Sequence, residues 1–162
     1  MSLNDILMTE LNTHSISVRS WKRSNSGAAH FDLGIIDIPR PTSSYTLGVA
    51  FHEIGHIVHS RIHSDYRVIP EYVIEYMAEQ FAITKLKEYG LNFREYEAYA
   101  TKYVMTCLSK YKNDGGDMHV IPAEISKWTG MDLMSWKVAK TVTVLNSPVR
   151  KKSDVQVKYS MS

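Results

Sequence analysis

The sequence lacks the features of a secreted, membrane-spanning or nucleic-acid-binding protein. Cys107 is the one cysteine among 162 residues, so no disulfide can form within the chain. No run of about 18 apolar residues is present to span a membrane, and the first fifteen residues do not have the basic and apolar segments of a signal peptide. The formal net charge of +2 is too small to indicate nucleic acid by itself. We therefore expect a cytoplasmic protein without a membrane partner, and the charge gives no indication of a nucleic-acid partner; the oligomeric state stays open.

Length and composition are those of an ordinary globular protein. A chain of 162 residues is long enough to bury a core and typically forms one domain. Hydrophobic residues make up 44% and charged residues 22%, as in most such domains. We expect a single domain over residues 1–162, with a helical subregion at 92–140 and a tail at 146–162.

The hydrophobic pattern predicts an α+β fold. Residues 15–22 and 29–38 alternate as strands, and we expect them to pair as an N-terminal β-hairpin with a bulge near Gly34. The strand before the central helix could form the rim of a site and, if it is a sheet edge, could pair with an extended peptide. Helices are expected at 1–13, 45–62, 70–89, 93–112, 122–129 and 132–140, a turn at 24–27, and further β segments at 141–145 and 155–159. The helix at 93–112 has an apolar stripe that we expect to pack in the core: Phe93, Tyr96, Ala100, Tyr103, Val104, Cys107, Leu108 and Tyr111.

The helix predicted at 45–62 contains the motif His-Glu-Ile-Gly-His at residues 52–56. Histidines four residues apart lie one turn apart on one helical face, so both imidazoles can reach the same metal ion. Zinc suits two such nitrogens completed by an oxygen or sulfur ligand. Glu53 points to another side, from which it could act on water as a general base without binding the metal. The motif therefore predicts a Zn²⁺ site with His52 and His56 as ligands.

The rest of this helix offers a second interpretation. Its apolar residues form one stripe, which is typical of a helix packed on a core. Its histidines form a narrow band on nearly the opposite side: His52, His56, His59 and His63. Such a band could be a solvated face, with the motif a coincidence in a structural domain.

A catalytic zinc usually has three protein ligands and one open position. The next predicted helix carries three glutamates on one face, Glu71, Glu75 and Glu79, which could also be a plain charged face. Glu75 lies 19 residues after His56, which leaves room for a loop and an antiparallel return of the chain. Geometry therefore favours Glu75 as the third ligand, with Glu71 and Glu79 as alternatives. If Glu75 is the ligand, Glu79 suits a supporting role, accepting the outer N–H of a ligand histidine.

Peptide hydrolysis also requires a group that stabilises the oxyanion, commonly a tyrosine, histidine or arginine near the metal. His119 follows a glycine-rich loop that could fold over the site, although a lone histidine is more often a surface residue. The sequence offers four candidates for this role: Tyr66, Tyr72, Tyr76 and His119.

The stretch HEIGHIVH at 52–59, followed by EYMAEQFA at 75–82, resembles the ImmA/IrrE family of zinc metallopeptidases. That family shows HExxH followed by an ExxAxxFA helix; this chain has Glu79 where the family commonly has asparagine. The resemblance covers about residues 44–82. It implies a small zincin fold of the gluzincin type and cleavage of a repressor or regulatory protein in a phage, mobile-element or stress setting. It also implies the base Glu53 and the ligands His52, His56 and Glu75.

We accordingly expect a zincin-like domain that hydrolyses peptide bonds with Zn²⁺ and takes a protein or peptide as its substrate. Two other functions stay open. A regulator could keep the zinc site and bind a partner without hydrolysis. The helices expected at 122–129 and 132–140 loosely resemble a helix-turn-helix, so a DNA-binding regulator is the third alternative, although the second helix has few side chains that could read bases.

Overall fold

The computed structural model describes residues 1–131, which form five α-helices and one mixed sheet of three strands. The expected α+β class is therefore confirmed. The elements expected at 132–140, 141–145 and 155–159, and the tail at 146–162, lie outside the described residues. In chain order the elements are α1 Leu3–Thr13, β1 Ser17–Lys22, β2 Ala28–His30, the 3-10 helix η1 Phe31–Leu33, β3 Ile35–Pro39, α2 Ser44–Ile62, the 3-10 helix η2 Tyr66–Val68, α3 Glu71–Glu88, α4 Arg94–Asn113, the 3-10 helix η3 Met118–Val120 and α5 Ala123–Thr129.

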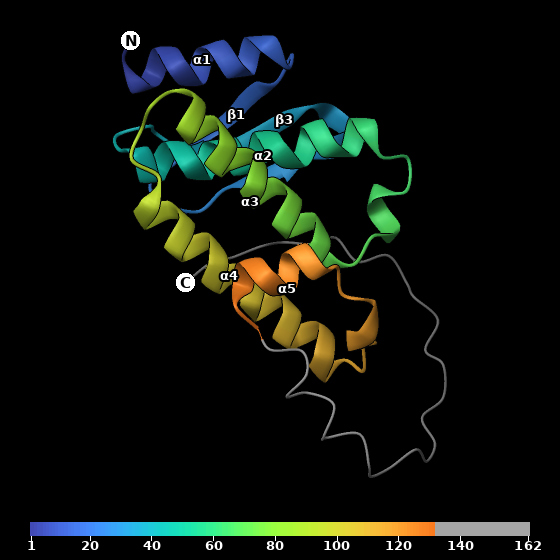
Figure 1. Cartoon of the computed structure of the whole chain (residues 1–162). Helices are drawn as coiled ribbons and strands as arrows, with labels where there is room; N and C mark the ends of the chain where they lie inside the picture. Colours follow the sequence, from blue (N-terminus) through green and yellow to red (C-terminus); the bar gives the residue numbers. More distant parts are fainter. Residues whose placement is uncertain (132–162) are drawn as a thin grey trace.

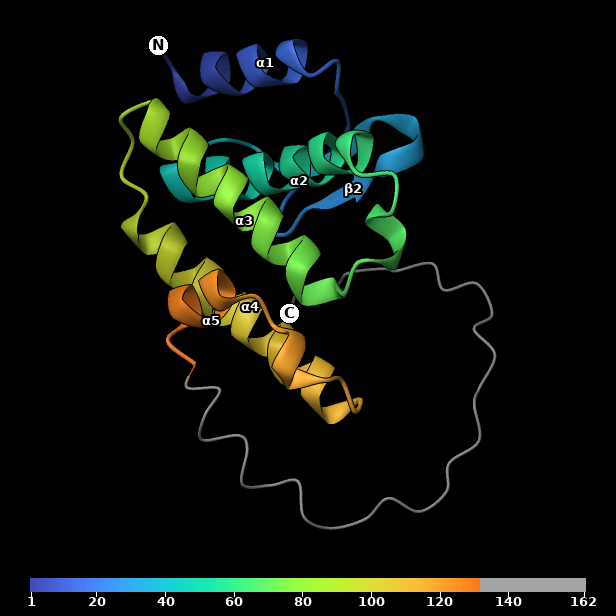
Figure 2. The same ribbon diagram turned by 45° about the vertical axis from the view of Figure 1, so that its right-hand side comes forward.

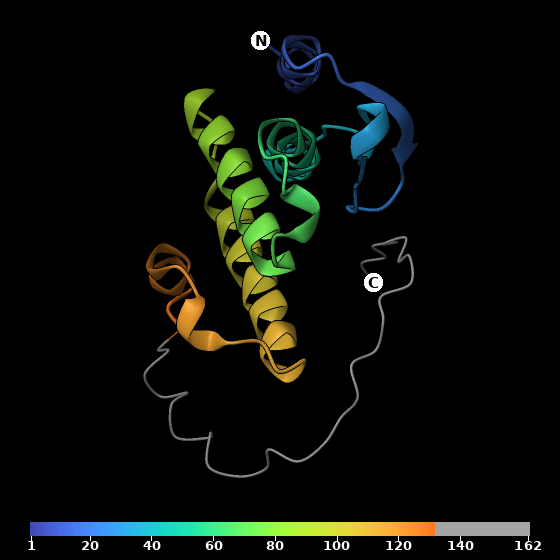
Figure 3. The same cartoon turned by 90° about the vertical axis from the view of Figure 1, so that its right-hand side faces the viewer.

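Helix α2 lies in the middle of the molecule. Figure 3 looks nearly along its axis and shows the sheet on one side of it and α3 on the other. Helix α1 packs against α2 from a third side (Figure 1). Helix α4 packs against α3 (Figure 2), and α5 packs against α4 on the side away from the sheet (Figure 3). Within residues 1–131 no helix has both the length and the apolar character needed to cross a membrane.

This central position buries α2 around its whole circumference from Thr46 to Ile57. The helix begins with a capping box, in which the Ser43 hydroxyl accepts from the Thr46 backbone N–H and the Thr46 side chain accepts from the Ser43 backbone N–H. The histidine band is therefore not a solvated face at its centre: His52 and His56 are 9% and 6% exposed, because α3 covers that side.

The sheet differs from the expected hairpin. Its strand order is β1-β3-β2, and β1 pairs with β3 in parallel, so these two strands are not a hairpin. The antiparallel pair is β2 with β3, joined by η1 and Gly34. Gly34 adopts a left-handed φ of 61°, which ends η1 and turns the chain into β3. The register shift lies between Val18 and Ser20, not near Gly34.

This topology also changes which strand could form a rim. The strand directly before α2 is β3, and β3 is the central strand, so the expected pairing of a peptide with a free edge of that strand is wrong. The free edge near α2 belongs to β2, which packs against α2. Any peptide that added to the sheet on this side would pair with β2.

The apolar side chains form two clusters. The larger one joins α1, the sheet, α2, α3 and α4, with Leu47, Ile54 and Ile57 among its fully buried members. The smaller one lies between α3, α4 and α5 and contains Tyr72, Val104, Cys107, Leu108, Ile121 and Ile125. Cys107 is thus a core residue, as its place in the predicted apolar stripe indicates.

Candidate metal centre

Three of the predicted site residues meet where α3 crosses α2. His52 and His56 lie one turn apart on α2, and Glu75 projects from α3 toward them. One ligand atom of each residue lies within 4.8 Å of the other two, and all three residues are buried. Glu71, one of the alternatives for the third ligand, instead pairs with Lys110 at 2.7 Å.

The distances within this group are close to those between the ligands of one small cation. The two imidazole Nε2 atoms are 2.9 Å apart, and Oε2 of Glu75 lies 3.3 Å from Nε2 of His52 and 3.5 Å from Nε2 of His56. Ligands at zinc bond lengths in a tetrahedral arrangement lie roughly 3.3–3.4 Å apart. Oε2 of Glu75 is buried and makes no hydrogen bond. A buried acceptor facing two imidazole nitrogens is compensated when a metal ion binds between them.

Small residues allow the two helices to approach this closely. A Cβ placed on Gly55 would lie 3.2 Å from both the Cα and the carbonyl oxygen of Ala78, and 3.1 Å from Cβ of Phe81. Gly55 belongs to the HExxH motif, and Ala78 follows Glu75 by three residues. The contact between Gly55 and Ala78 therefore brings α3 near enough for the carboxylate of Glu75 to reach both histidines.

The outer nitrogen of each histidine faces a different partner. Nδ1 of His52 lies 3.2 Å from Oε1 of Glu79, an ion-pair distance at which the ring N–H is not aligned for a hydrogen bond. Oε2 of Glu79 accepts a 2.6 Å hydrogen bond from the hydroxyl of Tyr96. Nδ1 of His56 is hydrogen-bonded to the hydroxyl of Tyr66 at 2.8 Å. These contacts orient both rings with Nε2 toward Glu75.

The electrostatics of the centre favour positive charge. Burial by itself lowers the pKa of His52, but the carboxylates of Glu79 and Glu75 outweigh it and raise that pKa well above the ordinary value. Burial likewise raises the pKa of Glu75, but His56 and His52 outweigh it, so the carboxyl stays ionised to lower pH than usual. Two buried carboxylates around two imidazoles therefore form a site that attracts a proton or a metal cation.

Glu53 follows His52 on α2, and its side chain extends toward the start of β2. Its side chain is 7% exposed and packs against Gly27, the residue before β2. A Cβ at position 27 would lie 2.5 Å from Cγ and 2.8 Å from Cδ of Glu53, so only glycine leaves room for this carboxylate. Burial raises the pKa of Glu53, against the opposing charges of His52 and His56. A carboxylate with a raised pKa accepts a proton more readily near neutral pH.

The four candidates for the oxyanion lie in different places. Tyr66 is buried, and its hydroxyl holds His56. Tyr72 packs in the smaller cluster with its ring centroid 4.9 Å from that of Tyr111. Tyr76 contacts the ring of Trp128 at 5.4 Å. His119 lies exposed in η3.

Several residues lie beside the metal centre although the sequence gives no indication of it. Tyr103 of α4, expected as a core residue, has its ring 6.4 Å from that of His52, and the Phe31 ring lies 5.9 Å from that of His56. The sequence predicts only a turn at Gly27 and only core packing for Tyr96. A glycine in a turn and a tyrosine at a periodic helical position look the same in the sequence whether or not they lie beside a metal centre.

Comparison of the chain with protein-family models, curated proteins and solved structures found no match, so the likeness to the ImmA/IrrE peptidases stays a prediction from the motif.

Proposed function

We propose that this protein is a zinc-dependent peptidase in which His52, His56 and Glu75 hold the metal. One observation carries the proposal: the buried Oε2 of Glu75, which makes no hydrogen bond, faces two imidazole nitrogens, and Glu53 is buried beside His52 on the same helix. Two nitrogens and one carboxylate oxygen are the ligand set of many catalytic zinc sites. A zinc ion held there supplies Lewis-acid chemistry, lowering the pKa of water toward about 7 and polarising a carbonyl.

In this proposal the protein's own residues move the proton and orient the ligands. Glu53 takes a proton from the attacking water and later passes it to the departing amine, which needs a carboxyl whose pKa lies nearer neutrality than usual. Glu79 and Tyr66 fix the two imidazole rings from behind. Glu79, which carries charge, also offsets the positive charge of the metal.

The edge of β2 gives a place for the substrate backbone. Among the described residues β2 has a strand partner on one side only, which leaves its other side available for an extended peptide. The residue before β2 is Gly27, which touches Glu53. A peptide paired with β2 is therefore held with a peptide bond close to the proposed base. This arrangement recognises the backbone and sets few demands on side chains.

The substrate class follows from the motif resemblance. We infer site-specific cleavage of a repressor or other regulatory protein, as in the ImmA/IrrE peptidases. The zincin-like identity of the domain belongs to the same proposal: its support is the motif helix crossed by a glutamate helix, beside a small mixed sheet.

The first experiment measures metal and hydrolysis in the same set of variants. The purified full chain is supplied with zinc, dialysed and analysed by atomic emission, and we expect about one zinc per chain. His56→Ala and Glu75→Ala should lose it, whereas Glu71→Ala, the control on the same helix, should keep it. Hydrolysis is followed by mass spectrometry on a proteome-derived peptide mixture, and Glu53→Gln should keep zinc but lose cleavage.

The outcomes separate the alternatives. If the unchanged chain binds zinc but cleaves no peptide, the result favours the alternative function, a regulator that binds zinc without hydrolysis. Zinc retained by Glu75→Ala moves the third ligand to another residue. Failure to bind zinc at all overturns the proposal.

A further inference from the structure

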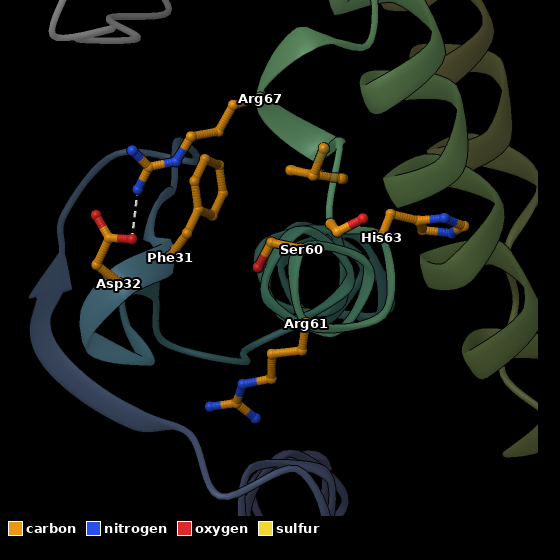
Figure 4. Close-up of a pocket in the computed structure, with 8 residues that line it drawn as sticks. Phe31, Asp32, Ser60, Arg61, His63 and Arg67 are labelled. Carbon is orange, nitrogen blue, oxygen red and sulfur yellow. Dashed lines mark hydrogen bonds and ion pairs between the residues drawn. The ribbon is translucent and has the colours of Figure 1, made fainter.

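A pocket of about 160 Å³ lies beside the metal centre, between η1, the last turn of α2 and η2 (Figure 4). It shares a wall with that centre. The ring of Phe31 lines the pocket and also lies 5.9 Å from the ring of His56. Tyr66 lines it too, packs edge-on against Phe31 at 5.5 Å and places its hydroxyl on His56. A ligand in the pocket is therefore next to the wall that supports one of the metal ligands.

The pocket differs from the metal centre in its charge. Among the described residues that line it, Arg61 and Arg67 carry permanent positive charges and Asp32 is the only acid. The metal centre instead gathers the carboxylates of Glu53, Glu75 and Glu79. Positive charge beside the pocket favours an anionic group in it, while the site of hydrolysis itself is rich in acids.

The two arginines have different partners. Arg61 donates to the backbone carbonyls of His14 and Ser15 at the end of α1, so its guanidinium is fixed in place. Arg67 pairs with Asp32 beside the ring of Phe31 (Figure 4), and the side chains of both are well exposed, at 71% and 77%. An ion pair this exposed contributes little to stability. A carboxylate from a ligand can therefore replace Asp32 at Arg67 without loss of the fold.

Distances along α2 relate the pocket to the site of cleavage. Ser60, which lines the pocket, follows His56 by one helical turn, or about 6 Å along the axis. An extended peptide advances about 3.3 Å per residue. The pocket is thus reached by a side chain about two residues from the peptide bond at the metal.

We propose that this pocket binds the carboxylate of an aspartate or glutamate of the substrate, about two residues from the cleaved bond. The inference rests on the proposed peptidase function and adds a substrate class to it. Arg67 exchanges its partner Asp32 for the carboxylate of the peptide, and Arg61 contributes a fixed positive charge nearby. The preference that follows is modest, because the exchange takes place at an exposed pair.

The test reads the sequences around cleaved bonds. The zinc-loaded full chain is incubated with a proteome-derived peptide mixture, and new termini are identified by mass spectrometry. We expect aspartate and glutamate to be enriched about twofold to fivefold at one position near the cleaved bond. Arg67→Gln should remove this enrichment while cleavage continues. Asp32→Asn, which removes the competing carboxylate, should increase it, and Arg67→Glu should turn it toward lysine and arginine.

The result separates this inference from the function on which it rests. Cleavage without an acidic preference, or a preference that Arg67→Gln leaves unchanged, overturns the inference and leaves the peptidase intact. No cleavage beyond that of Glu53→Gln overturns the peptidase, and the inference with it. Zinc content equal to that of the unchanged chain shows that each variant has kept its metal centre, as the exposure of both side chains predicts.

Discussion

The hydroxyl of Tyr96 donates a hydrogen bond of 2.6 Å to Glu79, whose other carboxylate oxygen lies 3.2 Å from Nδ1 of His52. Both Tyr96 and Glu79 are buried. Burial and the charge of Glu79 raise the pKa of the Tyr96 hydroxyl well above its ordinary value, so the hydroxyl stays protonated and donates. A Cβ on Gly48 would lie 2.7 Å from Cγ of Tyr96, so glycine at this position of α2 leaves room for the ring. Helix α4 thereby contributes to the orientation of a histidine on α2.

We expect Tyr96→Phe to weaken zinc binding by severalfold, up to about tenfold. Partners of metal-ligand histidines typically contribute 10–100-fold in affinity, and Tyr96 acts one step further away, through Glu79. Zinc affinity is measured by competition with a chromophoric chelator. In a Glu79→Ala background the same change should have no further effect, because the acceptor through which Tyr96 acts is absent.

Tyr89→Phe is the matched control for this prediction. It also removes a tyrosine hydroxyl that donates to a glutamate, here Glu10 at 2.7 Å, but away from the metal centre. Its zinc affinity should equal that of the unchanged chain. An equal loss of affinity in Tyr96→Phe and Tyr89→Phe would mean that the first acts through general stability alone.

Tyr66→Phe tests the support of the other histidine. The hydroxyl of Tyr66 is hydrogen-bonded to Nδ1 of His56, so its removal should lower zinc affinity by about tenfold or more. Tyr72→Phe removes the hydroxyl of another buried tyrosine, one that packs against Tyr111, and should leave the affinity unchanged. If Tyr66→Phe binds zinc as tightly as the unchanged chain, Tyr66 does not hold the ring of His56 for the metal.

Local patterns in the sequence are sufficient to predict that His52, His56 and Glu75 lie close together. His52 and His56 are related by the helical repeat alone, which fixes their spacing on α2. Glu75 needs one further step, the antiparallel return of α3, and the spacing of the chain allowed it. The buried positions of the α4 stripe, such as Ala100 and Val104, likewise follow from periodicity. The roles of His52, His56 and Glu75 in metal binding and hydrolysis stay predictions.

Contacts between distant segments were not visible in the same way. β1 pairs with β3 and not with β2 because β3 is the strand beside β1 in space. The alternation of apolar residues along a strand is the same for both pairings, so it does not distinguish them. Gly27 and Gly55 were read from the sequence as a turn residue and a motif residue. Their function is to leave room for Glu53 and for Ala78, and such close approaches appear only when the elements are packed.

The lowered pKa of Asp37 predicts how the stability of the protein depends on pH. This side chain is 1% exposed on the central strand and is bonded to Arg19, Ser20 and His30. The hydrogen bond from Arg19 is the main reason that its pKa lies well below the ordinary value, in spite of burial. A lowered pKa stabilises the folded state above the unfolded value of about 4, and this contribution is lost as the pH falls through the lowered folded value.

We therefore expect Asp37→Asn to destabilise the protein by about 1–3 kcal/mol at pH 7. The difference from the unchanged chain should shrink below about pH 4, because the unchanged chain then loses the same contribution. Urea unfolding at pH 7, 5 and 3 measures it. Asp32→Asn, at an exposed ion pair, should change stability by less than about 0.5 kcal/mol at each pH. A constant difference at all three pH values would show that ionised Asp37 contributes no stability.

Gly27→Ala tests the contact that places Glu53. The backbone φ of Gly27 is not in the left-handed region, so alanine can adopt the same backbone conformation. The effect of the substitution therefore comes from the added Cβ. That Cβ would overlap both Cγ and Cδ of Glu53, so the whole side chain has to move. We expect a loss of about 1–3 kcal/mol in the free energy of unfolding, as for other overpacked sites. Zinc content should stay unchanged, since none of the three ligands is displaced, while cleavage of the peptide mixture should fall as it does in Glu53→Gln.

The double variant Gly27→Ala, Glu53→Ala removes the overlapping atoms and should be more stable than the sum of the two single changes predicts. Strict additivity in urea unfolding would mean that the two residues do not touch, and that Gly27 has no part in positioning Glu53.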